Sequence, residues 1–200
     1  MGRIQQKRKQ FNGKLHFLYL GGMMRKVVLY ICMSLDGYIA DKSGSVDWIS
    51  GDGSDNDNPG SYGEFFETID TIIMGYKTYY QIVTQLSPEA WPYRGKKSFI
   101  ITNHKGDSTE EICFTNKELP GLIDELKNCE GKNIWICGGA NIANQLMEAD
   151  LIDRYYITMI PIILGAGLPL FAEHERKQDL KLVSVCSYNG MTDLVYERRK

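Results

Sequence analysis

The sequence predicts a single α/β domain in three layers, with a mostly parallel central sheet covered by helices on both faces. Apolar runs of strand length alternate with segments of helical length, which is typical of parallel sheets. The last two strands have no helix between them, and Asn189-Gly190 favours a tight hairpin turn there, so we expect an antiparallel C-terminal edge. The predicted strands are 26–33, 71–75, 97–102, 111–114, 133–138, 154–162, 180–187 and 192–198, and the predicted helices are 61–69, 77–86, 118–128 and 140–149.

The helices are predicted from apolar faces that recur with helical spacing. The first follows the Gly/Asp/Asn-rich loop 50–60, and the second follows directly on an apolar strand. The strands between them are short apolar runs, as expected for strands that are buried on both faces. The residues expected to face the sheet are Phe65, Phe66 and Ile69 in the first helix, Leu119, Leu122, Ile123 and Leu126 in the third, and Ile142, Leu146 and Ala149 in the fourth.

Composition narrows the class of protein. The chain is 43% hydrophobic and 24% charged, which is ordinary for a globular protein, and 200 residues can enclose one full core. Its five cysteines form no C-x-x-C pair, and its three histidines show no ligand spacing, so we expect reduced thiols and no metal site. A reducing cytoplasm is the expected compartment.

Residues 1–23 differ from the rest in charge. They carry five basic residues and no acid, and removing this +5 from the net −2 of the chain leaves −7 for residues 24–200. We predict a poorly ordered basic extension at 1–23 and one domain at 24–200. The apolar piece 15–20 is too short to span a membrane. A nucleic-acid-binding arm is the alternative for 1–23, but the acidic body opposes it, so we expect neither a nucleic acid nor a membrane as partner.

A glycine pair stands where the predicted strand 133–138 meets the helix 140–149. Two adjacent glycines allow backbone N–H groups to approach a ligand closely, and a helix N-terminus favours a phosphate. A tight turn without a ligand is the alternative interpretation of this junction. The residues predicted to contact a cofactor here are Gly138, Gly139, Ala140, Asn141, Ile142 and Ala143.

Two further strand ends carry residues suited to an anionic ligand. Gly75 ends one strand and is followed by Lys77 and Thr78, which offer a positive charge and a hydroxyl. Thr102 and Asn103 follow another strand, before His104-Lys105. Ligands of open α/β sheets bind at such carboxyl ends. The three strand ends together predict a binding site for a dinucleotide, although the chain lacks the G-x-G-x-x-G motif.

Four segments, in order, resemble the dihydrofolate reductase superfamily. VVLYICMSLDGYIADKSGSVDWIS is similar to the first strand and mobile loop of its riboflavin branch, and MGYKTYY is similar to the "MGRKTWE" segment. IWICGGANIANQLMEADLIDRYYITMIP resembles the glycine-pair segment, and LGAGLPLF resembles the closing loop. The resemblance covers residues 24–200 and is strongest to the C-terminal reductase domain of the bifunctional riboflavin-biosynthesis deaminase-reductase.

The resemblance implies a dihydrofolate-reductase-like fold with NADPH as cofactor. The nicotinamide would lie against Ile39 and Ala40, and the loop 42–50 would close over the reacting carbon. Thr158 matches the threonine that is hydrogen-bonded to a helix carboxylate in dihydrofolate reductases. We assign Glu64 as that carboxylate in this chain. A solvated surface position explains Glu64 equally well. Asp36 is the third predicted catalytic residue, although an aspartate beside a turn glycine is usually structural.

The predicted function is that of an NADPH-dependent oxidoreductase acting on a small heteroaromatic molecule. The resemblance is closest to 5-amino-6-(5-phosphoribosylamino)uracil reductase of riboflavin biosynthesis. Dihydrofolate reduction is one alternative, and a non-catalytic nucleotide-binding module is the other. The resemblance also implies a homodimer, for which Tyr155-Tyr156 and the run 160–164 offer contacts.

Overall fold

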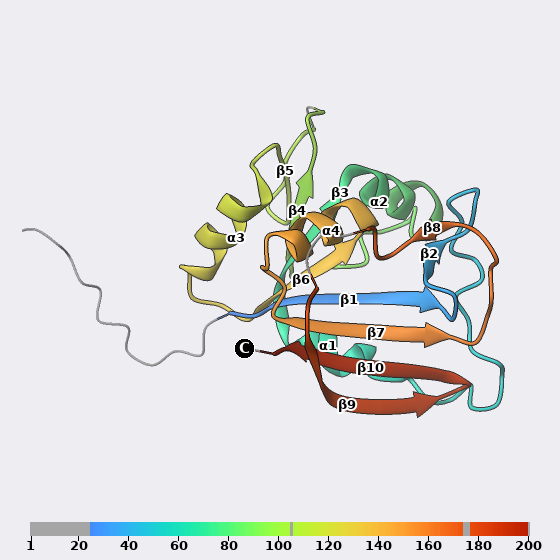
Figure 1. Cartoon of the computed structure of the whole chain (residues 1–200). Coiled ribbons are helices and arrows are strands. Elements are labelled where there is room, and N and C mark those ends of the chain that lie inside the picture. Colours follow the sequence, from blue (N-terminus) through green and yellow to red (C-terminus); the bar gives the residue numbers. More distant parts are fainter. Residues whose placement is uncertain (1–24, 105, 174–176, 200) are drawn as a thin grey trace, which may run out of the picture.

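The computed structural model describes residues 25–104, 106–173 and 177–199, so the predicted extension 1–23 and Lys105 lie outside the described residues. Its main sheet has eight strands in the order β5-β4-β3-β6-β1-β7-β10-β9 (Figure 1). The strands of this sheet are β1 (Val27–Ser34), β3 (Ile69–Gly75), β4 (Lys97–Ile101), β5 (Ile112–Thr115), β6 (Asn133–Gly138), β7 (Arg154–Ile160), β9 (Leu180–Tyr188) and β10 (Met191–Arg198).

The helices agree with the predicted pattern, with differences at their ends. They are α1 (Tyr62–Glu67), α2 (Tyr76–Gln81), α3 (Leu119–Lys127) and α4 (Ala140–Glu148). The predicted helix 77–86 is α-helical only as far as Gln81 and continues as a wider π-helical turn, Ile82–Leu86. Two short strands were not predicted, β2 (Tyr38–Ala40) and β8 (Leu168–Pro169), which pair with each other in a separate two-stranded sheet.

The main sheet is parallel from β5 to β7 and antiparallel from β7 to β9, which confirms the predicted fold class. The hairpin between β9 and β10 also forms as predicted. Asn189 and Gly190 both have positive φ angles, 45° and 72°, as a primed hairpin turn requires.

Alternation along the strands divides the core between the two faces of the sheet. In β1, Val27 and Leu29 pack against α3 and α4, whereas Val28 and Tyr30 pack against α1 and α2. In β6, Ile134 and Ile136 join the first group. Figure 1 shows α3 and α4 on one side of the sheet and α1 on the other. The two apolar clusters make the three layers.

The direction of the chain connections reverses between β3 and β6, which are neighbours in the sheet. After β3 the chain passes through α2 to β4 on one side, and after β6 it passes through α4 to β7 on the other. Helices that leave neighbouring parallel strands in opposite directions open a crevice at the carboxyl ends of those strands. The fold therefore places a crevice between Gly75 and Gly138.

In the described part of the chain, no helix is both long and apolar enough to cross a membrane.

Candidate active site

A cleft of about 1490 Å³ lies at this crevice and extends to both faces of the sheet. It is lined by the carboxyl ends of β1, β3, β4 and β6, by β2 and β8, and by the start of α2, α3 and α4. Sites for a single drug-sized ligand have volumes of about 300–1,000 Å³. This cleft therefore has room for a cofactor and a second molecule together.

The glycine pair faces the start of α2 across the cleft. A Cβ atom added to Gly139 would lie 3.4 Å from Thr78 Oγ1, and one added to Gly138 would lie 3.9 Å from it. Gly138 has a φ of +135°, which residues other than glycine rarely adopt, and its peptide bond to Gly139 is cis. Side chains at these positions would fill the cleft, so the pair forms a cradle in which backbone N–H groups and the Thr78 hydroxyl are close together.

The third strand end completes this side of the cleft. Thr102, Asn103 and His104 line it, and His104 N–H donates a hydrogen bond to Thr102 Oγ1 at 2.9 Å. The His104 ring lies 5.0 Å from the ring of Tyr76, which is the first residue of α2. Lys105, the next residue along the chain, is outside the described residues.

Most of the predicted cofactor-binding residues come together in this cleft. Ala143 is the exception, because it is fully buried one turn into α4 and packs in the core. The predicted residues that line the cleft are Ile39, Ala40, Gly75, Lys77, Thr78, Thr102, Asn103, Gly138, Gly139, Ala140, Asn141 and Ile142.

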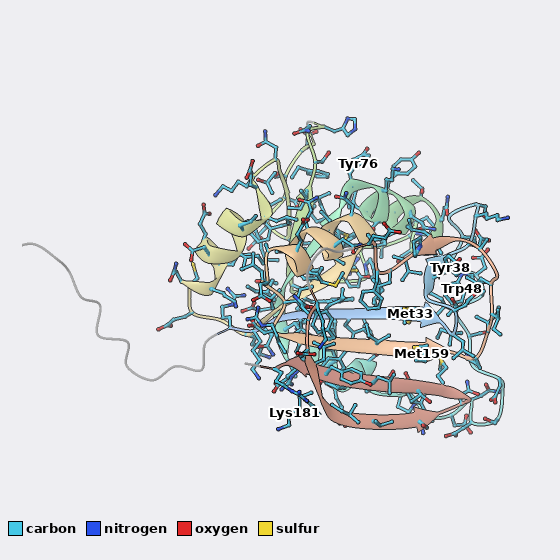
Figure 2. The ribbon with its side chains drawn as sticks, viewed as in Figure 1. Met33, Tyr38, Trp48, Tyr76, Met159 and Lys181 are labelled. Carbon is cyan, nitrogen blue, oxygen red and sulfur yellow. The ribbon has the colours of Figure 1, made fainter. Side chains whose placement is uncertain are left out.

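The loop after β2 covers one end of the cleft. Val46 and Ile49 line the cleft, and Gln81 Nε2 of α2 donates a hydrogen bond to the Gly44 carbonyl at 2.9 Å. Trp48 donates its indole N–H to the Ser45 carbonyl at 3.1 Å and so anchors the loop on itself. Figure 2 shows Trp48 and Tyr38 near the carboxyl end of β1.

On the face of α1, the cleft continues into a recess whose walls are aromatic. We call this the aromatic recess and define it by Tyr30, Tyr62, Tyr93 and Trp135. The ring centroids of Tyr30 and Tyr62 are 5.8 Å apart, and Trp135 lies 6.0 Å from Tyr62 and 5.2 Å from Tyr93, all edge to face. The Trp135 N–H donates to the Tyr30 carbonyl at 3.0 Å, which fixes the indole. The recess is thus a rigid apolar pocket beside the glycine cradle.

The carboxylate of Asp193, a buried residue of β10, lies behind the recess. Thr158 on β7 donates a hydrogen bond to its Oδ1 at 2.6 Å, Tyr188 donates to the same oxygen at 3.2 Å, and Ser61 donates to Oδ2. Asp193 is 2% exposed. Cys32, Thr158 and Asp193 are paired in register across β1, β7 and β10, so they share the face of the recess.

The surroundings of Asp193 affect two neighbouring groups. Burial raises the pKa of the Cys32 thiol to about 11, and the charge of Asp193 adds to this. Burial likewise raises the pKa of Tyr30, with a smaller contribution from Asp193. Both groups line the cleft and are neutral near pH 7. Sequence reasoning missed Asp193. The signal was an aspartate inside a strand, where that residue type is depleted.

The predicted pairing of Glu64 with Thr158 does not form. Glu64 is exposed on α1 and does not line the cleft, whereas Thr158 is bonded to Asp193. Asp36 also lies outside the cleft lining. Its carboxylate accepts hydrogen bonds from Ser34 Oγ at 2.6 Å and from the Gly165 N–H at 2.7 Å, and these bonds lower its pKa. Asp36 therefore ties the turn after β1 to the loop before β8.

The fold and cleft define an α/β protein with an open cleft at the switch point of its sheet, the position at which sheets of this kind bind ligands. Residues 25–194 match the model of the RibD C-terminal domain family. The chain belongs to this family, and the resemblance to reductases of the dihydrofolate reductase superfamily is confirmed.

Known proteins similar to this chain agree with that membership. It is 39% identical over 177 residues to the uncharacterized protein YwjB of Bacillus subtilis (strain 168), covering 88% of this chain and 99% of YwjB. A putative riboflavin biosynthesis protein from Shewanella sp. PV-4 has a similar structure, with a TM-score of 0.76 and 29% identity over 88% of this chain and 99% of that one.

A second similar structure is that of the deaminase/5-amino-6-(5-phosphoribosylamino)uracil reductase from Thermotoga maritima. Its TM-score is 0.66, and the likeness covers 88% of this chain but 57% of that one. At 13% identity, this likeness concerns the fold alone.

Proposed function

We propose that this protein is an NADPH-dependent reductase of a small heteroaromatic molecule, most like 5-amino-6-(5-phosphoribosylamino)uracil reductase. The observation that carries the proposal is the single cleft in which the glycine cradle adjoins the aromatic recess. The cleft is larger than one ligand needs, and its two parts differ in chemistry. The five cysteines are free thiols, which suits a reducing compartment such as the cytoplasm.

The residues of the cleft fit a dinucleotide cofactor. The N–H groups at the start of α4, the Thr78 hydroxyl and the Lys77 ammonium would hold the diphosphate. Ile39 and Ala40, which are 8% and 7% exposed, would form an apolar wall for the nicotinamide. Bound NADPH supplies the hydride, and the loop carrying Val46 and Ile49 excludes water from the site.

Asp193 is the acid that we assign to the proton side of the reaction. It lies 2.6 Å from Thr158, on the face of the sheet that carries Cys32 and Tyr30 into the cleft. Asp193 does not line the cleft, and neither do the hydroxyls bonded to it. It would act through Thr158, which interacts with Tyr30 and Cys32 in the cleft lining, and is a positioning residue. This assignment replaces Glu64.

Oxidation of NADPH, followed by absorbance with pyrimidine and pterin substrates, tests the proposed function. We expect turnover with at least one heteroaromatic compound. We also expect NADPH to bind saturably when no such compound is present. Turnover with dihydrofolate would favour the first alternative. Saturable NADPH binding without turnover on any substrate would favour the non-catalytic module.

His104 is predicted to select NADPH over NADH. Its ring is at the edge of the cleft, beyond the strand end that would face the adenosine ribose, and it can donate a hydrogen bond to a 2′-phosphate. We expect His104→Ala to weaken NADPH binding about tenfold, the lower end for a bond to a charged group, and to leave NADH unchanged. Titrations with both cofactors check this, and equal losses for both would contradict it.

The protein is also proposed to form a homodimer. Of the predicted contacts, Tyr155 and Ile160 are each 2% exposed and belong to the core of the chain itself, whereas Ile163 is 69% exposed and available for contact. A second surface is more extensive. Edge strand β9 exposes Leu182, Val183 and Val185, at 49%, 46% and 51%. Exposed apolar side chains on an unpaired edge strand favour association.

Substitution on β9 tests this assembly. Leu182 and Val185 face the same side of the sheet, because a bulge separates them. We expect Val185→Lys to convert a dimer to a monomer in light scattering at micromolar concentration. Ser184→Lys, on the opposite face of the same strand, is the matched control and should leave the dimer intact. A monomeric wild-type protein would refute the proposal.

A further inference from the structure

The aromatic recess differs from the rest of the cleft in charge. Among the described residues, its walls are the rings of Tyr30, Tyr62, Tyr93 and Trp135, with the thiols of Cys32 and Cys137 beside them. Tyr93 Oη and Cys137 Sγ are 3.6 Å apart and are hydrogen-bonded to each other. None of these side chains is an acid or a base that is charged near pH 7.

The ionisable groups of the recess are held neutral by burial. Burial raises the pKa of Tyr62 to about 12 and that of Cys137 to about 12. It raises the pKa of Tyr93 further in the same direction. The side chains that line the recess are therefore neutral near pH 7, and Asp193, which lies behind them, is an acid and not a cation.

Charged residues do line the cleft, but they belong to other elements. Lys77 is in the first turn of α2, next to Thr78 and the glycine cradle. Lys117 and Glu118 precede α3, and Glu148 ends α4. Of these two lysines, Lys77 lies at the part of the cleft that we assign to the cofactor, and Lys117 forms an ion pair with Glu125.

A phosphate or carboxylate placed in the recess would lose its hydration and find no cation. Burying an unpaired charge is costly, whereas a flat neutral ring can contact the edges and faces of the four aromatic side chains. Tyr62 is 40% exposed and so offers the most accessible of the four rings, and it contacts Trp135 edge to face, as Trp135 does Tyr93.

From this we infer that the substrate is an uncharged planar heterocycle without a phosphate group, and that the aromatic recess binds it. The inference rests on the proposed reductase function and narrows it. The phosphoribosyl substituent named for the Thermotoga maritima reductase would have no cationic partner in this recess. The reaction would accordingly act on a free base or its neutral derivative.

Binding of two matched pairs of compounds to the NADPH-saturated protein tests the inference. Each pair joins a neutral compound to its phosphate ester, riboflavin with riboflavin 5′-phosphate and uridine with uridine 5′-phosphate, so that the members differ only in the phosphate. We expect at least one neutral ring to bind, at least tenfold more tightly than its phosphorylated relative, by calorimetry. NADPH affinity is measured first on the same sample.

Tyr62 provides the variants, because it is 40% exposed and its replacement spares the core. Tyr62→Ala should weaken binding of the neutral ring about tenfold, as expected for loss of one stacking partner. Tyr62→Arg should reverse the order within a pair, since a guanidinium pairs well with phosphate. Tyr80→Ala is the matched control, because Tyr80 is 53% exposed and does not line the cleft. This control should change neither the affinity for the neutral ring nor the order of affinities within a pair.

The outcomes separate the inference from the proposed function. If NADPH binds and a phosphorylated compound binds as tightly as its neutral relative, or no neutral ring binds, the inference is overturned and the cofactor assignment stands. If NADPH does not bind, the proposed function fails whichever ring binds. An equal effect of Tyr62→Ala and Tyr80→Ala would also overturn the inference.

Discussion

Gly139→Val should reduce NADPH affinity by at least about 100-fold while the protein remains folded. Gly139 has φ −82° and ψ −169°, an extended conformation that valine adopts readily, so the backbone tolerates the change. The added Cβ would lie 3.4 Å from Thr78 Oγ1, and the two methyl groups would occupy the cradle. Loss of two hydrogen bonds to a charged diphosphate would cost about 3–6 kcal/mol.

Fluorescence titration with NADPH measures this loss, and thermal unfolding checks the fold. Gly121→Val is the matched control, since a Cβ at this position in α3 meets nothing within 4 Å. We expect the control to bind NADPH as the wild type does. Wild-type affinity in Gly139→Val would refute the cofactor site.

Asp193→Asn should lower turnover about 10²–10⁴-fold, the range for a correctly placed acid or base, and leave NADPH affinity within about twofold. The carboxylate accepts hydrogen bonds from three hydroxyls, and an amide nitrogen would face at least one of them as a second donor. NADPH should be unaffected, because Asp193 does not line the cleft. We also expect one limb of the pH–rate profile to disappear.

A purely structural role for Asp193 gives a different result. Leaving a buried hydroxyl unpaired costs about 1–3 kcal/mol, so urea unfolding should show a loss of stability in either case. If turnover per folded molecule and its pH profile stay unchanged, the proton role is refuted. Thr158→Val should reproduce the kinetic defect, and Glu64→Gln, at an exposed position, should not.

Local pattern was enough to predict the eight strands and four helices, because each carries an apolar face or run of its own length. It was not enough for β2 and β8, which are three and two residues long and exist only because they pair with each other. The end of α2 was also misjudged. The apolar spacing continues through Ile82, whereas the backbone widens into a π-helical turn.

That the glycine pair and the neighbouring strand ends meet in one cleft could be predicted, since their residues follow directly on predicted strands. The acid could not, because the partner of Thr158 lies 35 residues further along the chain and meets it only through the register of β7 with β10. Tyr30, Tyr62, Tyr93 and Trp135 also come from four separate segments. Each was compatible with an ordinary core position until the faces of the sheet were known.

The position of β1 has a consequence for synthesis on the ribosome. It lies at the centre of the sheet, with both of its neighbours, β6 and β7, encoded far downstream. Lys26, just before β1, bonds to Asn133, 107 residues later. At typical elongation rates, β1 waits roughly 5–20 s for its first neighbour. Its apolar sequence is exposed over that interval, so a nascent chain stalled before residue 133 should be a strong ligand for ribosome-associated chaperones.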